Sequence, residues 1–247
     1  MFINNMVLSL VMPKERRRVD GKFQVMHNVF DEFTNKTLFK LISEGYFDGL
    51  ESPIKIGKEA NIFSAKKGDK RIMVKIYRLE SCDFNRMYDY IKDDPRYIGL
   101  RGKKRKIILS WVKREYRNLL KAREAGVNVP TPLTFKNNVL VLEFIGRNDN
   151  VAPMLKDEKP KDPESFYRMV IENIRKMHKA GLVHGDLSAF NILNFEEKPV
   201  FIDFSQCSTI NNTRAREFFE RDVKNVAVFF RKLGLIIDEE ALIKEIK

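Results

Sequence analysis

Five polar residues, spread over the sequence, have the types and order needed for phosphoryl transfer. In HGDLSAFN, Asp186 and Asn191 lie five positions apart, so a carboxylate could handle an incoming hydroxyl and an amide could hold a metal ion. In FIDFSQ, Asp203 follows a short apolar run, where it could chelate the magnesium that bridges nucleotide phosphates. In IMVK, Lys75 could hold phosphate, and Glu115 further along the chain could pair with it.

Taken singly, these residues have ordinary structural explanations. A lone strand lysine such as Lys75 usually faces solvent, a glutamate such as Glu115 commonly lies on a helix surface, and an aspartate often forms a turn or a cap. His184, in an apolar setting, is expected to be a core residue rather than a ligand or a base. The joint order of Lys, Glu, D-x-x-x-x-N and a strand-end Asp favours the catalytic interpretation.

The first half of the chain has the hydrophobic spacing of strands around one long helix. Apolar runs over residues 61–65 and 72–77 flank a turn and predict a hairpin that carries Lys75. Residues 107–125 predict the helix that carries Glu115. The two charges would therefore come from adjacent elements.

A second hairpin is expected over residues 133–144, after which apolar residues take helical spacing over 164–180 and 213–233. A strand-rich first part and a helical second part predict an α+β, bilobal, protein-kinase-like fold with a cleft between the lobes. The expected division is an N-terminal tail at 1–22, an N-lobe at 23–143 with a short leading helix and a flexible basic loop at about 82–106, and a reduced helical C-lobe with the catalytic and metal loops at 144–247.

Positive charge is concentrated in one part of the chain. The 247 residues include 46 Lys and Arg against 34 Asp and Glu, and residues 58–123 hold 20 of the basic and 8 of the acidic ones, which accounts for the whole net charge of +12. The densest part, RGKKRK at 101–106, follows a turn-prone stretch and predicts a mobile basic loop. Such a run is either a solvated surface or a contact for a phosphate-rich partner such as nucleic acid.

The composition excludes several classes of protein. A hydrophobic content of 43% is too high for a disordered polyelectrolyte, and two cysteines cannot form a disulfide framework. No window is apolar enough for a membrane span, and a basic cluster follows the apolar N-terminal run, the reverse of a secretory signal. These features predict a cytoplasmic protein without membrane attachment, whose native start is either Met1 or Met12.

Several segments together resemble the RIO-type atypical serine/threonine protein kinases, in particular the RIO-one branch. GKEANIF is the most specific segment, because it stands where ordinary protein kinases have a G-x-G-x-x-G loop. HGDLS with IDFSQ is closer to the RIO-one pattern than to the relatives with an N-terminal winged helix. The resemblance covers roughly residues 25–240, through IGKEANIF (56–63), VKIY (74–77), WVKREYRNL (111–119), VLVLEFIG (139–146), HGDLSAFNIL (184–193), IDFSQ (202–206) and ERDVKNV (220–226).

The resemblance implies a role for each polar residue in an ATP site. Lys75 would bind phosphate and pair with Glu115. Asp186 would be the catalytic carboxylate, with Asn191 and Asp203 as ligands of Mg²⁺, or of Mn²⁺ in its place. Two further groups would complete the nucleotide site: Gly57, Lys58, Glu59, Ala60 and Asn61 as the phosphate loop, and Glu143, Phe144 and Ile145 as the adenine-binding hinge.

Members of this family are regarded as ATPases and serine/threonine kinases that act in maturation of the small ribosomal subunit. The resemblance therefore implies ATP, a pre-ribosomal small-subunit particle and its rRNA as partners, together with autophosphorylation. Some relatives are thought to pass phosphate to the metal-loop carboxylate, here Asp203. The ATPase interpretation fits the 44 residues after Asp203, which we expect to be too few for a peptide-docking subdomain. Asp222 resembles the buried aspartate with which ordinary kinases brace the catalytic loop.

Two other functions are compatible with parts of the pattern. Small-molecule phosphotransferases of the aminoglycoside or choline type also contain H-G-D-x-x-x-x-N followed by I-D-F, but they build the substrate pocket from helices after the metal-binding aspartate. A non-catalytic assembly factor could bind nucleotide and RNA through the basic loop. The complete set of catalytic residue types argues against this second alternative.

Overall fold

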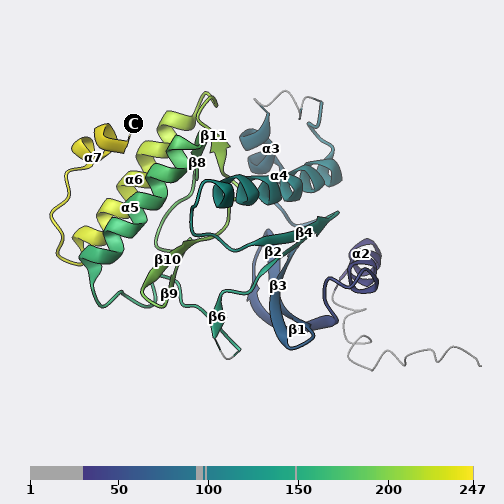
Figure 1. Ribbon diagram of the computed structural model, residues 1–247. Coiled ribbons are helices and arrows are strands. Elements are labelled where there is room, and N and C mark those ends of the chain that lie inside the picture. Colours follow the sequence, from purple (N-terminus) through teal and green to yellow (C-terminus); the bar gives the residue numbers. More distant parts are fainter. Residues whose placement is uncertain (1–29, 93–96, 98, 148, 247) are drawn as a thin grey trace, which may run out of the picture.

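The computed structural model describes residues 30–92, 97, 99–147 and 149–246, and has two lobes (Figure 1). This confirms the α+β, bilobal, protein-kinase-like fold. The predicted tail, residues 1–22, lies outside the described residues. The N-lobe consists of strands β1 (Gly49–Ile56), β2 (Ala60–Lys67), β3 (Lys70–Tyr77), β4 (Pro132–Lys136) and β5 (Val139–Glu143), with helices α2 (Glu32–Ser43), α3 (Phe84–Ile91) and α4 (Lys104–Glu124).

The five N-lobe strands form one antiparallel sheet in the order β1-β2-β3-β5-β4, with α2 and α4 on opposite faces (Figure 1). Side chains alternate across the central strand β3. Ile72, Val74 and Ile76 are buried with residues of α2 in one apolar cluster. The intervening Lys75 therefore points to the other face, toward α4 and the C-lobe.

The segment predicted as a flexible basic loop at 82–106 contains regular structure, so that prediction is wrong in part. Helix α3 begins after Asp83, whose Oδ1 accepts a hydrogen bond from Arg86 N at 3.0 Å. Met87 and Ile91 lie four positions apart, one helical turn, and both are buried in the main core. Helix α4 starts at Lys104, three residues earlier than expected, and takes up half of the basic run at 101–106. Helix α3 is therefore packed in the core with α4.

The C-lobe is built on two long helices that face each other. Asp162 caps α5 by accepting a hydrogen bond from Ser165 N at 3.0 Å, and Gly181 lies just beyond its end with φ of 71°. The elements of this half are β6 (Gly146–Arg147), β7 (Asn150–Val151), α5 (Pro163–Lys179), β8 (Leu182–Val183), β9 (Ile192–Phe195), β10 (Lys198–Phe201), β11 (Ser208–Thr209), α6 (Ala215–Arg231) and α7 (Glu239–Ile246).

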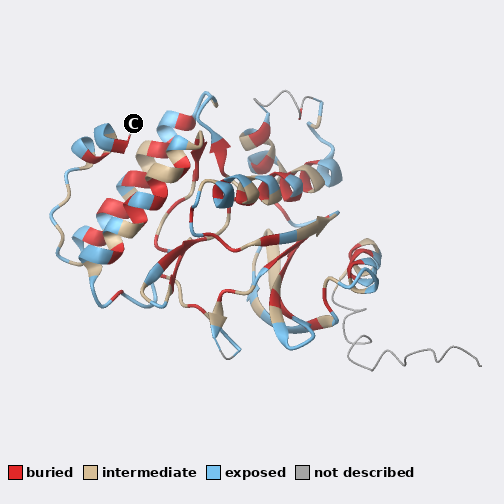
Figure 2. Ribbon diagram, viewed as in Figure 1, coloured by how far each residue is buried: buried red, intermediate tan, exposed pale blue. Residues whose placement is uncertain are grey.

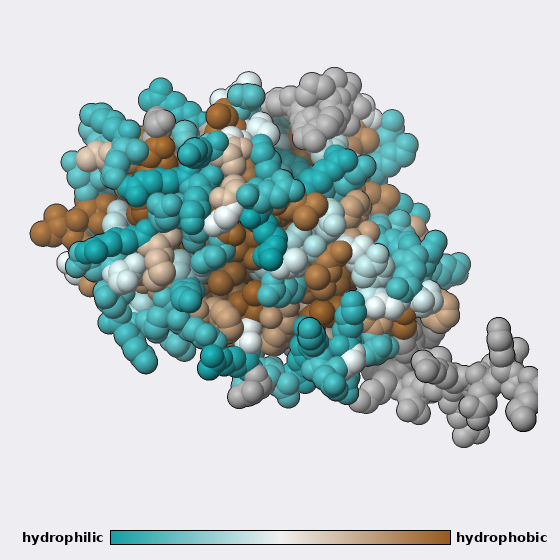
Figure 3. All heavy atoms as spheres, viewed as in Figure 1, coloured by the Kyte–Doolittle hydropathy of each residue, from teal (hydrophilic) through white to brown (hydrophobic). Residues whose placement is uncertain are grey.

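Buried residues lie along the facing sides of α5 and α6 and along α4 (Figure 2). One core cluster contains residues of α4, α5 and α6, so it joins the lobes through α4. Hydrophilic residues cover most of the face seen in Figure 3, and hydrophobic residues show mainly between the C-lobe helices and the sheet. No helix in the described ranges has both the length and the apolar character that crossing a membrane requires.

Candidate active site

Lys75, Glu115 and Asp203 form a charge cluster where the lobes meet. Strand β3 supplies Lys75, helix α4 supplies Glu115, and the turn after β10 supplies Asp203. Lys75 Nζ lies 2.7 Å from Glu115 Oε1 and 3.0 Å from Asp203 Oδ1. The lysine and the glutamate are almost fully buried, and the Asp203 side chain is 41% exposed. The fold thus brings together three predicted site residues that are far apart in the sequence.

The contacts within this cluster set the ionisation of its members. Burial works against the charged form of Lys75, but Asp203 and Glu115 outweigh it and raise its pKa well above the usual value. Desolvation also works against ionised Asp203, yet Lys75 and a hydrogen bond from Ser205 lower its pKa to about 2. Lys75 and Asp203 are therefore both charged at neutral pH.

Tyr77 belongs to this cluster and was not singled out from the sequence. Its side chain is buried, and its hydroxyl donates a hydrogen bond to Glu115 Oε2. The signal was the spacing in VKIY, because residues two apart in a strand share a face and Tyr77 follows Lys75 by two. Glu115 is therefore held by a cation on one oxygen and a hydroxyl on the other.

The predicted catalytic loop, residues 184–191, brings Asp186 and Asn191 into contact. Asn191 Nδ2 donates to the backbone oxygen of Asp186 at 2.7 Å and to its Oδ2 at 3.2 Å. Gln206 Nε2 lies 3.5 Å from the same Oδ2. Burial raises the pKa of Asp186, and the charge of Asp203 acts in the same direction. A carboxylate with a raised pKa is suited to accept a proton from a hydroxyl or a water molecule.

Asp222 braces this loop from α6, as expected. Its Oδ2 accepts a hydrogen bond from Gly185 N at 2.7 Å, and its Oδ1 accepts one from Leu187 N at 2.8 Å. Only 3% of Asp222 is exposed, and burial raises its pKa to about 7. The two backbone groups flank Asp186, so Asp222 fixes the direction in which the Asp186 carboxylate leaves the chain.

His184 is a core residue, which confirms the sequence interpretation. Its ring packs edge-on against Phe204, and Nε2 lies 3.1 Å from the backbone oxygen of Ile202. Burial lowers its pKa to about 4. The ring is therefore neutral at pH 7 and supports, through packing, the turn that carries Asp203.

A cavity of about 510 Å³ opens between the lobes beside these residues. Its walls are mostly apolar, and its polar groups include Lys75, Glu115, Asn191 and Asp203. This is the usual composition of a small-molecule site. The apolar walls come from both lobes and include Ile62, Met73, Leu142, Ile145, Leu193 and Ile202.

The predicted hinge lies at one edge of this cavity. Ile145 lines it, and the Ile145 backbone oxygen accepts a hydrogen bond from Ala152 N at 2.9 Å. The Glu143 carboxylate turns elsewhere, because its Oε2 accepts a hydrogen bond from Thr131 N at 2.9 Å. Phe144, which connects the two, is not among the described residues that line the cavity.

The predicted phosphate loop is a tight turn that leads into β2, where Asn61 pairs with Ile76. Gly57 N donates to Ala60 O at 3.1 Å, and a Cβ added at Gly57 would lie 2.8 Å from that oxygen, so the turn requires glycine. The Glu59 backbone oxygen accepts hydrogen bonds from Arg78 N at 2.9 Å and from Cys82 Sγ at 3.2 Å. The Lys58 oxygen accepts one from Ser81.

These hydrogen bonds join residues 78–82 to the predicted phosphate loop, and they place the start of α3 beside that loop. Burial raises the pKa of the Glu59 carboxyl, and the nearby Asp203 charge adds to this effect. The Glu59 side chain therefore lies close to the metal loop. None of residues 57–61 is among the described residues that line the cavity, which is bordered here by Ile54, Lys55 and Ile62.

The residues present fit a magnesium ion with a nucleotide. Asn191 and Asp203 both line the cavity. Within the described residues, Asp203 Oδ2 and Asn191 Oδ1 take part in no hydrogen bond, so two oxygens remain available. No group of three His, Cys, Asp or Glu side chains that could hold a metal occurs in the described ranges. Mg²⁺ commonly uses one or two protein oxygens together with phosphates, which matches this donor set.

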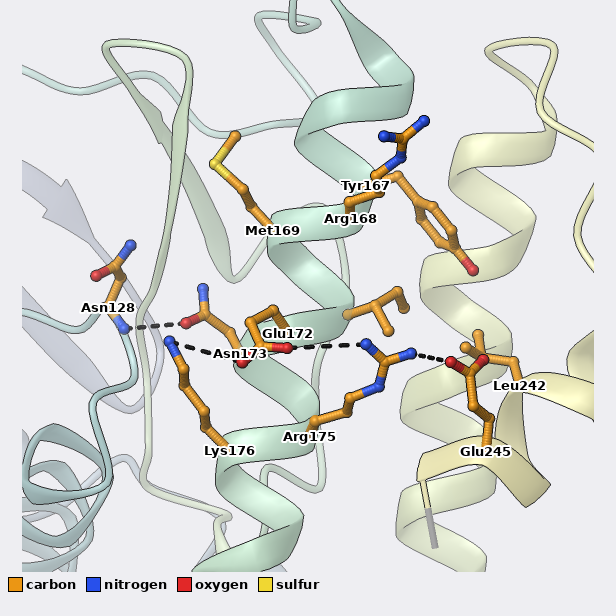
Figure 4. A pocket seen from close by; sticks show the side chains of 11 residues that line it. Asn128, Tyr167, Arg168, Met169, Glu172, Asn173, Arg175, Lys176, Leu242 and Glu245 are labelled. Carbon is orange, nitrogen blue, oxygen red and sulfur yellow. Dashed lines mark hydrogen bonds and ion pairs between the residues drawn. The ribbon is translucent and has the colours of Figure 1, made fainter.

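A second cavity, of about 540 Å³, lies on the outer side of the C-lobe between α5 and α7 (Figure 4). Its charged groups already have partners. Arg175 contacts Glu172 at 3.7 Å and also pairs with Glu245, and Lys176 lies 3.9 Å from Glu172. None of the predicted site residues lines this cavity, so it has no part in the candidate active site.

Residues 61–242 match the family described as the RIO domain. The chain belongs to the RIO family. It is 41% identical over 222 residues to the RIO-type serine/threonine-protein kinase Rio1 of Haloferax volcanii, a match that covers 90% of this chain and 77% of the relative. It is 37% identical over 186 residues to the same-named protein of Thermoplasma acidophilum, covering 75% and 98%. The resemblance to the RIO-one branch is thereby confirmed, and the protein is an enzyme of the RIO type.

Solved structures of RIO kinases share the fold. The crystal structure of the Rio2 kinase-ADP/Mg²⁺-phosphoaspartate complex from Chaetomium thermophilum matches with a TM-score of 0.67 at 24% identity, covering 85% of this chain and 65% of that one. A second Rio2 structure from the same organism matches with a TM-score of 0.65 at 25% identity, covering 81% and 61%. The RIO chain thus spans somewhat less than two thirds of either Rio2 chain.

Proposed function

We propose that this RIO chain transfers the γ-phosphoryl group of ATP, with Mg²⁺ held by Asn191 and Asp203. The observation that carries the proposal is the convergence of Lys75, Asp203 and Asn191 on one polar region of the cavity between the lobes. Lys75 would hold the α- and β-phosphates, and the apolar walls would take the adenine. Mg²⁺, when bound, would reduce the negative charge of the phosphates. Mn²⁺ would serve in its place.

Asp186 would accept the proton of the attacking hydroxyl or water. Its raised pKa brings it closer to the range in which a carboxylate works as a general base. Asp222 would keep it in place through the two backbone hydrogen bonds. The acceptor would be a serine or threonine hydroxyl, or water in an ATPase cycle.

Asp203 would also act as a phosphoryl acceptor on the protein itself. With a pKa of about 2, this carboxylate is ionised at physiological pH, which is the form in which a carboxylate can act as a nucleophile. The similar Rio2 protein is described as a complex with ADP, Mg²⁺ and phosphoaspartate. Hydrolysis of such an acyl phosphate would give the chain an ATPase cycle, and its formation would register as autophosphorylation.

The partner we propose is a pre-ribosomal small-subunit particle, contacted through rRNA phosphates. The basic run at 101–106 is exposed, and it lies at the start of α4, outside the cavity residues. Lys104 and Arg105 lie over the rings of Phe84 and Phe33, at 5.2 and 4.2 Å, which holds these cations at the surface. The two buried free thiols suit a reducing cytoplasm.

Incubation with γ-labelled ATP and Mg²⁺, without other protein, tests the catalytic proposal. We expect free phosphate or labelled protein. Asp186→Asn, which keeps the size of the side chain, should lose the release of free phosphate. Transfer that depends on added aminoglycoside or choline would instead support a small-molecule phosphotransferase. Normal turnover in Asp186→Asn would contradict the role of Asp186.

The RNA contact is tested by titrating an rRNA fragment at several salt concentrations. Changing Arg101, Lys103, Lys104, Arg105 and Lys106 to Ala should reduce the log-log salt slope by about 2 to 4, because each phosphate contact on a single strand contributes about 0.7. ATP turnover without RNA should stay the same. An unchanged salt slope with weaker ATP binding would contradict the RNA role.

A further inference from the structure

The two oxygens of the Asp203 carboxylate have different surroundings. Oδ1 receives two hydrogen bonds, from Ser205 Oγ at 2.7 Å and from Lys75 Nζ at 3.0 Å. Oδ2 receives none from the residues that the structure describes. Ser205 is 5% exposed, so water has little access to its hydroxyl. Oδ1 of this carboxylate therefore has its hydrogen-bonding capacity filled, and Oδ2 is free to bind another group.

The position of Ser205 is fixed by its neighbours. Asp203 has a positive φ of 63°, a strained conformation for a residue with a side chain, and the buried Phe204 follows it. Asn118 Nδ2 on α4 donates to the backbone oxygens of Phe204 at 3.1 Å and of Cys207 at 2.9 Å. The turn that carries Ser205 is thus attached to α4 on both sides of the serine, and its hydroxyl cannot readily move away from Oδ1.

We infer that Ser205 is a positioning residue that reserves Oδ1. Oδ2, through which Asp203 would also hold Mg²⁺ before transfer, is then the phosphoryl-accepting oxygen. This inference rests on the proposed function. In the first step Oδ2 forms a bond to the γ-phosphorus while the bond from that phosphorus to the bridging oxygen of ADP breaks, and ADP leaves with the electron pair. In the second step a water oxygen attacks the phosphorus, its proton passes to Asp186, and the bond between phosphorus and Oδ2 breaks.

The same hydrogen bond acts differently on the two steps. In the acyl phosphate Oδ1 is the carbonyl oxygen, and both donors can stay in place. When the bond to Oδ2 breaks, negative charge returns to the carboxylate, and a donor already aimed at Oδ1 stabilises that charge without reorganisation. Hydrogen bonds to charged groups are stronger than those to neutral groups. The loss of the Ser205 hydroxyl should therefore slow hydrolysis of the acyl phosphate more than it slows phosphoryl transfer to Oδ2.

The kinetic experiment compares Ser205→Ala with two other variants of the full chain. Ser205→Thr keeps the hydroxyl, and Ser208→Ala is the matched control, since Ser208 is also 5% exposed but its Oγ has no partner among the described residues. In Ser205→Ala we expect steady-state phosphate release to fall about tenfold and the hydroxylamine-sensitive phosphoprotein to increase, with the KM for ATP little changed. Ser205→Thr should restore both, and Ser208→Ala should match the unmodified chain.

Equal phosphoprotein levels in Ser205→Ala and Ser208→Ala would overturn the inference while leaving the proposed function intact. Absence of phosphate release and of labelled protein from the unmodified chain would instead overturn the proposed function. A crystal structure with ADP, Mg²⁺ and beryllium fluoride, which binds a carboxylate oxygen as an acyl-phosphate mimic, tests the assignment without turnover. We expect the adduct on Oδ2 with Ser205 Oγ still bonded to Oδ1. An adduct on Oδ1, or ADP bound with no adduct, would contradict the inference.

Discussion

The two aspartates beside the cleft are held in place by different physical means. Asp203 is held by charge, because Lys75 contacts it at 3.0 Å and is itself shared with Glu115. Asp186 is held through its backbone, because Asp222 accepts hydrogen bonds from the residues on either side of it. The first arrangement depends on the balance of charges and responds to a bound cation. The second fixes a loop before any ligand arrives.

Removal of Lys75 should have the largest effect. Lys75→Met keeps much of the side-chain volume but leaves Glu115 buried without its cation, which should cost about 3 to 5 kcal/mol of unfolding free energy. Phosphoryl transfer should fall at least about a thousandfold, since an electrostatic contact to the phosphates is also lost. Urea denaturation and ATP turnover measure the two effects. Lys36→Met, at a side chain 74% exposed, is the control and should change neither. Full activity of Lys75→Met would contradict the claim that the charge of Lys75 is needed to hold Asp203.

Removal of the brace should affect stability and rate together. Asp222→Ala leaves the Gly185 and Leu187 N–H groups buried without an acceptor, at a cost of about 2 to 4 kcal/mol. Turnover should fall while ATP affinity stays close to normal, because Asp222 does not line the cavity between the lobes. Thermal unfolding and ATP titration provide the measurements. An unchanged melting temperature would mean that the loop is held in another way.

The pH dependence of stability separates two buried groups with opposite behaviour. The pKa of Asp222 is raised from 3.8 to about 7, so the stability it contributes below pH 3.8 is lost as pH rises through 7. The pKa of His184 is lowered from 6.5 to about 4, so the stability it contributes above pH 6.5 is lost as pH falls through 4.

These two contributions oppose each other between pH 4 and 6.5. Asp222→Asn should therefore become more stable as pH rises across this range, and His184→Gln should become less stable, each by about 3 kcal/mol from its remaining titrating group. Urea denaturation at pH 4.5 and 6.5 measures the slopes. Parallel slopes in the two variants would contradict the assignment of either shift.

Loss of the Tyr77 hydroxyl should have the smallest effect. Tyr77→Phe removes one donor from Glu115 but keeps the Lys75 contact, so the cost should be about 1 to 2 kcal/mol, and turnover should fall less than about tenfold. The measurements are the same as for Lys75→Met. An effect as large as that of Lys75→Met would mean that the hydroxyl, rather than the ammonium, holds Glu115.

Hydrophobic spacing predicted the elements that are long or sharply patterned. The hairpin of β2 and β3, the hairpin of β4 and β5, and helices α4, α5 and α6 were all expected near their observed positions. The strand β1 was not, because Pro53 interrupts its pattern at a register shift on the sheet edge. Helix α3 was missed because it is only eight residues long, and its burial of Met87 depends on packing in the core with α4.

The charged members of the candidate site could be predicted because their types are unusual where they occur. Tyr77 and Ser205 were not predicted, although both lie two residues from a predicted site residue. Their roles depend on which oxygen of a carboxylate each hydroxyl reaches, and that follows from sheet register and from the backbone conformation of Asp203. Asp222 was expected only through the family pattern, since an aspartate in a helix carries no sign of burial on its own.

The hydrogen bond from Cys82 to the phosphate loop makes that thiol a reporter of loop opening. Burial raises the pKa of Cys82 to about 11, and its Sγ contacts the backbone oxygens of Glu59 and Arg78. Alkylating reagents attack the thiolate, so labelling requires residues 78–82 to separate from the loop. Cys207 lies deeper, with its pKa raised by burial to about 12, and requires a larger opening. The labelling rates of the two thiols therefore report two separate free energies of opening, one at the edge of the candidate nucleotide site and one in the core.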